Sequence, residues 1–97
     1  MNSFFILIPV LNEADNILRL VQDLQILSTE LQKQFDVRVI LIDDGSRDNT
    51  SQLAKQAAVE SGVQLQVLRH ETNQGPGKAF ATGFCHLATL LTDNDLV

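Results

Sequence analysis

The sequence predicts an α/β domain in which parallel strands alternate with helices in the order β-α-β-α-β-α-β. Short, nearly continuous apolar runs at 4–10 and 37–42 are typical of strands buried on both faces of a parallel sheet. After each run, apolar residues recur at spacings of three and four, as they do on the buried face of a helix. Such alternation predicts right-handed crossovers, with helices covering the faces of the sheet.

Length and composition limit the possible functions. The 97 residues are enough for one small domain, and a hydrophobic content of 44% is enough to build a core. The net charge of −5 argues against binding nucleic acid or an anionic membrane through a general positive field. The single cysteine, Cys85, excludes an internal disulfide and favours a cytoplasmic protein; its apolar neighbours predict a buried packing thiol. The first apolar run is too short to span a bilayer and lacks the basic start of a secretory signal.

The first strand, at 4–10, leads into a helix that is predicted from Glu13 to about Gln34. Asn12 and Asp15 have the spacing of a capping box at the start of this helix. Its expected apolar face consists of Ile17, Leu20, Val21, Leu24, Leu27 and Leu31.

The second strand, at 37–42, precedes a second helix. Ser46 or Asp48 is the predicted cap of this helix, and Gly62 is its predicted stop. The alternation of apolar and polar residues at 63–68 then predicts a third strand.

The loop RHETNQGPG separates the third strand from a third helix, which is predicted from Lys78 to Leu91. His70 and His86 have no second histidine or cysteine at metal-ligand spacing, so they are interpreted as a loop residue and a helix residue. The final residues, DNDLV, are expected to begin a fourth strand, which indicates the N-terminal part of a longer protein. The residues of the third helix expected to face inward are Phe80, Phe84, Leu87, Ala88 and Leu91.

Two adjacent carboxylates, Asp43 and Asp44, directly follow the second strand in the stretch ILIDDGSRDNTSQL. Ligands of open α/β sheets bind beyond the carboxyl ends of the strands, where 9–13 and 73–78 are also expected to converge. Because successive strand residues point to opposite faces, one carboxylate is predicted to hold the loop or cap the second helix and the other to face the crevice. The alternative is that both only terminate the strand and cap the helix.

Three familiar kinds of site do not fit the sequence. A Rossmann dinucleotide site needs G-x-G-x-x-G after the first strand, where this chain has IPVLNEAD. A P-loop needs G-x-x-x-x-G-K-[ST], but TNQGPGKAF has no glycine five residues before Gly77, and an alanine follows its lysine. A phospho-receiver domain would place paired acids after its first strand, whereas here they follow the second.

Three segments resemble the motifs of the family 2 glycosyltransferases, which have the Rossmann-like GT-A fold. The family's I-P-x-Y-N-E is resembled by IPVLNEADNI, its V-D-D-G-S-x-D-x-T by LIDDGSRDNT, and its N-x-G-x-x-x-A-x-x-x-G by NQGPGKAFATGF. The segments occur in the family's order and cover essentially the whole chain. The nearest subgroup is that of the dolichyl-phosphate mannosyltransferase-like enzymes. The resemblance implies that residues 1–97 are the N-terminal part of a single GT-A domain, truncated before the D-x-D motif.

The resemblance also implies that the site binds a nucleotide-sugar donor. Asp44 would contact the base, and Asp43 would be a supporting position at the same strand end. Gly75, Gly77 and Lys78 would lie beside the nucleotide, although the glycines could instead only form the turn and the lysine be solvated. The wall of the nucleoside pocket would be formed by Pro9, Val10, Leu11 and Glu13.

The chain departs from the family pattern in two places. Leu11 stands where the family often has tyrosine, so a ring that would stack on the base is missing. The family's D-x-D metal motif ends the fourth strand, beyond Val97. The string DND at 93–95 precedes that strand and is not assigned to metal binding.

The resemblance implies that the full-length protein is an inverting glycosyltransferase, with a UDP- or GDP-linked donor and a lipid-phosphate or glycan acceptor. A divalent metal, Mg or Mn, and a general base would be held by residues beyond this chain, so the 97 residues alone are expected to be inactive. Any membrane association would come from the C-terminal region, and the enzyme is expected in the cytoplasm or at the cytoplasmic face of a membrane. The alternatives are a nucleotidyltransferase and a non-catalytic or truncated nucleotide-binding domain.

Overall fold

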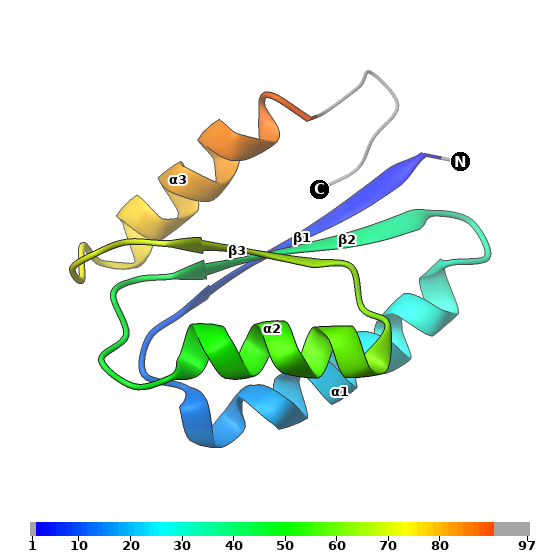
Figure 1. Ribbon diagram of the computed structural model, residues 1–97. Coiled ribbons are helices and arrows are strands. Elements are labelled where there is room, and N and C mark those ends of the chain that lie inside the picture. Colours follow the sequence, from blue (N-terminus) through cyan, green and yellow to red (C-terminus); the bar gives the residue numbers. More distant parts are fainter. Residues whose placement is uncertain (1, 91–97) are drawn as a thin grey trace.

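A three-stranded parallel sheet forms the centre of the chain, of which the computed structural model describes residues 2–90 (Figure 1). The predicted α/β alternation is confirmed through the third helix, and the predicted fourth strand lies outside the described residues. Helices α1 (Ala14–Leu31) and α2 (Thr50–Ser61) lie against one face of the sheet, and α3 (Pro76–Leu87) lies against the other. The strands stand in the order β1 (Ser3–Val10), β2 (Asp36–Asp43) and β3 (Leu65–Arg69).

Strand β2 is central, and its apolar run is buried on both faces. Ile40 and Ile42 pack on the α3 side with Phe5 of β1, whereas Val39 and Leu41 pack toward α1 and α2. All of these β2 side chains are at most 2% exposed. A strand that is covered on both sides has no polar face, which explains why the sequence shows a continuous run instead of an alternation.

Helix α1 begins and ends near its predicted limits, but its start is not the predicted capping box. Asn12 has a left-handed backbone (φ 52°), and its Oδ1 accepts a hydrogen bond from the N–H of Arg47 at 2.8 Å. Asn12 therefore joins the loop after β1 to the loop after β2 and does not cap α1. Leu27 was expected on the buried face, yet it is exposed because the described residues do not cover this turn of α1.

Only one of the two predicted caps contacts α2. The carboxylate of Asp48 accepts the N–H of Thr50 at 3.1 Å and also its hydroxyl. Ser46 turns instead toward the loop after β1, where its hydroxyl accepts the N–H of Asn12 at 2.8 Å. The predicted stop is confirmed, because α2 ends at Ser61 and Gly62 follows in the left-handed conformation (φ 76°).

The predicted inward face of α3 is partly wrong. Phe80 and Phe84 are 40% and 56% exposed, and Ala88 is also exposed, while Leu91 lies outside the described residues. The helix also begins and ends earlier than predicted, at Pro76 and Leu87. The residues that it buries are Ala79, Gly83 and Leu87.

A close approach between α3 and the sheet explains this orientation. A Cβ added at Gly83 would lie 2.8 Å from Cδ2 of Leu7 and 3.0 Å from Cδ1 of Ile42. Only very small side chains fit at this contact, so the phenylalanine rings turn outward. Cys85 on the same helix is exposed too, and the prediction of a buried thiol is therefore wrong.

Candidate functional site

A crevice of about 370 Å³ lies at the carboxyl ends of β1 and β2 and is closed on one side by the start of α3. It brings together most of the residues that the sequence singled out, from three separate segments. Three predicted residues are not on its wall: Asp43 is buried, and Gly77 and Lys78 lie exposed in the first turn of α3. The lining residues are Pro9, Val10, Leu11, Glu13, Asp44, Asn73, Gly75, Pro76 and Ala79.

Asp43 is 0% exposed and points to the face of the sheet that α1 and α2 cover. Its Oδ1 accepts the N–H of Ser46 at 2.9 Å, and its Oδ2 accepts the hydroxyl of Ser51 in α2. The guanidinium of Arg69 lies 3.9 Å from the same Oδ2. Asp43 thus holds the loop after β2 to the first turn of α2, and it does not reach the crevice.

Asp44 points to the other face, where it lies on the wall of the crevice. Its Oδ1 accepts the N–H of Gln74 at 2.9 Å and lies 2.7 Å from Nδ1 of His70. Its Oδ2 accepts the N–H of Gly75 at 2.8 Å. These hydrogen bonds, the one from Gln74 first and that from His70 next, hold the pKa of Asp44 below its usual range. The group is therefore a carboxylate at neutral pH.

His70 is the important residue of this site that the sequence did not reveal. It is 8% exposed, and its Nε2 lies 2.7 Å from the hydroxyl of Thr82 in α3. The strand register accounts for its position. Because Asp43 stands opposite Arg69 in the β2–β3 pair, the next residues along, Asp44 and His70, meet just beyond the strand ends. A search for histidines and cysteines at metal-ligand spacing could not reveal the pair of Asp44 and His70. Placing the carboxyl ends of β2 and β3 side by side in the sequence could have revealed it.

The loop that carries Leu11 and Glu13 is held in place by the loop after β2. The N–H of Glu13 donates to the hydroxyl of Thr50 at 3.0 Å, and the N–H of Ala14 donates to Oδ2 of Asp48 at 3.2 Å. The hydroxyl of Thr50, followed by the N–H of Ala14, holds the pKa of Asp48 below its usual range. Two chain segments far apart in sequence therefore form one braced wall of the crevice.

Gly45, which follows the two carboxylates, allows the loop before α3 to pass close to its own backbone. Its backbone is left-handed (φ 81°), and a Cβ at this position would lie 2.5 Å from the carbonyl carbon of Thr72 and 2.6 Å from the nitrogen of Asn73. Any side chain here would collide with the backbone of the loop before α3. The glycine thus lets Gln74 and Gly75 come within hydrogen-bonding distance of Asp44.

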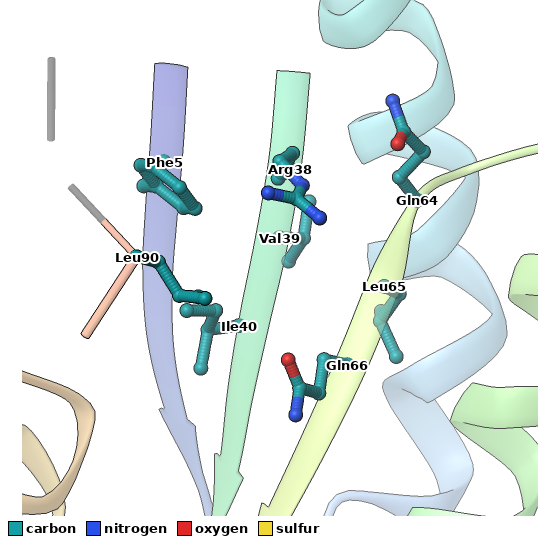
Figure 2. A pocket seen from close by; sticks show the side chains of 8 residues that line it. All are labelled: Phe5, Arg38, Val39, Ile40, Gln64, Leu65, Gln66 and Leu90. Carbon is teal, nitrogen blue, oxygen red and sulfur yellow. The ribbon is translucent and has the colours of Figure 1, made fainter. Parts of the chain in front are cut away.

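A second hollow, of about 220 Å³, lies on the α3 side of the sheet toward the amino ends of the strands (Figure 2). Figure 2 shows Phe5, Arg38 and Gln66 on three neighbouring strands of the sheet, where they line this hollow. The guanidinium of Arg38 lies 5.7 Å from the centroid of the Phe5 ring. None of the predicted site residues lines this hollow, and ligands of parallel sheets bind at the opposite strand ends. The crevice beside Asp44 is therefore the better candidate.

Metal ligands and membrane spans were also sought in the described part of the chain. Within residues 2–90, no three histidine, cysteine or acidic side chains lie close enough together to hold a metal ion. No helix in that range is both long enough and apolar enough to cross a membrane.

Known proteins resemble this chain in sequence and in fold. The model of the family described as "Glycosyl transferase family 2" matches residues 5–89. A protein of uncharacterised function from Methanocaldococcus jannaschii is 34% identical over 77 residues, which are 79% of this chain and 30% of that protein. An undecaprenyl-phosphate 4-deoxy-4-formamido-L-arabinose transferase from Pseudomonas fluorescens is 35% identical over 79 residues, 81% of this chain and 23% of the other.

A solved structure shares the fold. It is the mannosyltransferase PcManGT from Pyrobaculum calidifontis in complex with GDP-Man and Mn2+. The match has a TM-score of 0.67 at 19% identity and covers 87% of this chain and 24% of that one. The chain therefore spans less than a third of the length of each of these proteins.

Proposed function

The chain belongs to glycosyl transferase family 2 and has the GT-A fold, and we propose that it is the N-terminal, donor-binding part of a longer enzyme. That enzyme would transfer a sugar from a UDP- or GDP-linked donor to a lipid phosphate or a glycan, with inversion at the anomeric carbon. In this proposal the crevice at the ends of β1 and β2 holds the nucleoside of the donor.

The observation that carries the proposal is an ionised carboxylate on the wall of an otherwise largely apolar crevice. Apolar surfaces from Pro9, Leu11 and Pro76 can cover a base and a ribose. Asp44, held ionised by its hydrogen bonds, can accept a further hydrogen bond from a ring N–H. The mannosyltransferase of the same fold was solved with a bound GDP-Man, which supports a nucleotide-sugar donor here.

A lipid phosphate is the better-supported acceptor. The name of the relative from Pseudomonas fluorescens, undecaprenyl-phosphate 4-deoxy-4-formamido-L-arabinose transferase, includes a polyprenyl phosphate. This name supports a polyprenyl-phosphate acceptor over a glycan and agrees with a dolichyl-phosphate mannosyltransferase-like enzyme. With such an acceptor, we place the reaction at the cytoplasmic face of a membrane, to which the enzyme would bind through its C-terminal region.

No three histidine, cysteine or acidic side chains of residues 2–90 lie close enough together to hold a metal ion. We therefore assign the Mg or Mn ion expected for the enzyme, and its general base, to residues outside this part of the chain. The Mn2+ in the mannosyltransferase complex supports the use of such an ion. It follows that residues 1–97 alone should catalyse no transfer.

The test uses the full-length protein with radiolabelled UDP- and GDP-sugars, Mg or Mn, and either polyprenyl phosphate or a glycan as acceptor. Labelled sugar should appear on the lipid, and Asp44→Asn should reduce its formation. Residues 1–97 alone, assayed in parallel, should produce none.

The outcomes separate the alternatives. Nucleotide binding without transfer to any acceptor would favour a non-catalytic domain. Formation of a nucleotide sugar from a nucleoside triphosphate and a sugar phosphate would identify a nucleotidyltransferase, which the family assignment does not favour.

A further inference from the structure

Asn12 lies between two residues of the crevice wall but does not line the crevice itself. Leu11 and Glu13, on either side of it, are both lining residues. The backbone of Asn12 is left-handed (φ 52°), a conformation that asparagine adopts more readily than most residues with a side chain. This turn of the backbone leaves both neighbours on the crevice wall and directs Asn12 toward the loop after β2.

Two hydrogen bonds join Asn12 to the loop after β2. Its N–H donates to Oγ of Ser46 at 2.8 Å, and its Oδ1 accepts the N–H of Arg47 at 2.8 Å. The two bonds run in opposite directions between the same two segments. They therefore fix both the separation of these segments and their relative orientation.

Ser46 is a rigid anchor for this contact. It is 2% exposed, and its own N–H donates to Oδ1 of Asp43 at 2.9 Å. Its carbonyl oxygen accepts Nη2 of Arg69 at 2.8 Å. The loop after β2 is thus held to the sheet independently of Asn12, so the contact gives the wall beside Asn12 a fixed position.

We propose that Asn12 is a positioning residue, which holds the crevice wall at Leu11 and Glu13 in the shape that binds the donor. The inference rests on the proposed function, because it assumes that the crevice holds the nucleoside of the donor. It goes further by naming a residue that determines donor affinity without touching the ligand.

Neighbouring backbone hydrogen bonds limit the size of the expected effect. The N–H of Glu13 donates to the hydroxyl of Thr50 at 3.0 Å, and the carbonyl oxygen of Val10 accepts the N–H of Asp44 at 2.9 Å. Loss of the contact at Asn12 should therefore loosen this wall without unfolding the domain. A loosened wall has to be ordered when the nucleotide binds, which reduces affinity. The expected loss is about fivefold, as for one neutral hydrogen bond.

The first experiment measures the binding of UDP and GDP to variants of the full-length protein by isothermal titration calorimetry. Asn12→Gly keeps the left-handed backbone but removes the acceptor, and should weaken the tighter-binding nucleotide about fivefold. Asn12→Asp keeps both the acceptor and the tolerance of a left-handed backbone, so it should stay within about twofold of the unmodified protein. Asn49→Gly is the matched control and should not change the affinity. Asn49 is an exposed asparagine in the loop after β2, with an ordinary backbone (φ −92°) and no side-chain hydrogen bond that caps α2.

The second experiment breaks the same contact from the other side. Ser46→Ala removes the acceptor of the Asn12 N–H and leaves Asn12 itself unchanged. It keeps the backbone groups of Ser46 that bond to Asp43 and Arg69. The loss of nucleotide affinity should again be about fivefold.

Kinetics separate a positioning role from a purely structural one. In the transfer assay, Asn12→Gly should raise the KM for the donor about fivefold and leave kcat within about twofold, because it weakens ground-state and transition-state binding alike. A purely structural role would lower the melting temperature and the amount of active enzyme. It would therefore reduce the apparent kcat and leave both the KM and the nucleotide affinity unchanged.

The outcomes distinguish this inference from the proposed function. If folded Asn12→Gly binds as tightly as the unmodified protein, or if Asn12→Asp loses as much affinity as Asn12→Gly, the inference is wrong and the proposed function stands. If the unmodified full-length protein binds neither UDP nor GDP, both are wrong. The melting temperature of each variant checks folding, and if Asn12→Gly does not fold, the affinity of Ser46→Ala decides the question.

Discussion

Asp43 and Asp44 are neighbours in the chain, yet their carboxylates lie on opposite faces of the sheet. Asp43 bonds to Ser51 of α2 on one face, and Asp44 bonds to His70 and lines the crevice on the other. This division follows from the alternation of side chains along a strand, which continues to the end of β2. One carboxylate serves the fold, and the other is available to a ligand.

The first prediction compares the two carboxylates by substitution in the full-length protein. Asp44→Asn should weaken nucleoside diphosphate binding about tenfold or more, because the new amide group replaces an oxygen that accepts an N–H. Asp43→Asn should change this affinity by less than about threefold but lower the free energy of unfolding by about 1–3 kcal/mol. Calorimetry and urea unfolding measure the two effects. Equal, small losses of affinity in both variants would contradict the assignment of Asp44.

The second prediction concerns pH. The pKa of Asp44 in the folded protein lies below its ordinary value, so the carboxylate stabilises the fold above the unfolded value of about 3.9. This stabilisation should disappear as the pH falls through the lower, folded value. The difference in melting temperature between the unmodified protein and Asp44→Asn should therefore shrink as the pH falls below about 4. A difference that grew on acidification would contradict the assigned direction.

The third prediction uses two glycines of α3 as a matched pair. Gly83→Ala should destabilise the protein by about 1–3 kcal/mol, because its Cβ would lie 2.8 Å from Cδ2 of Leu7. Gly77→Ala meets no atom within 4 Å and should stabilise by up to about 1 kcal/mol, as alanine favours a helix. Chemical unfolding of both variants tests the close approach of α3. Equal effects would show that the contact at Gly83 relaxes without cost.

The fourth prediction concerns the missing aromatic ring. Leu11 is 37% exposed on the crevice wall, so there is room for a larger side chain. Leu11→Tyr should increase the affinity for nucleotides about threefold to tenfold, because an aromatic ring stacks on a base better than an aliphatic side chain does. Leu11→Met, which keeps the size without a ring, is the control and should leave the affinity unchanged. Weaker binding by Leu11→Tyr would mean that the base does not lie against this residue.

The sequence by itself determined the three described strands, the order of the elements and the opposite orientations of Asp43 and Asp44. These features depend on local rules. A strand covered on both faces consists of consecutive apolar residues, and successive side chains of a strand point to opposite faces of the sheet. The same rules placed Pro9, Leu11 and Glu13 at a strand end beside Asp44, and the crevice brings them together. What Asp44 contacts in a ligand stays a prediction.

Tertiary structure alone decided the environment of Asp44 and the orientation of α3. The partnership of Asp44 with His70 joins residues 26 positions apart and depends on the register of β2 against β3. Helical periodicity allowed α3 to bury either its phenylalanines or its small residues. The narrow space above Leu7 admits only the face with Gly83, so Phe80 and Phe84 turn outward. Steric fit between two elements is a property of their separation, which no periodicity within one element encodes.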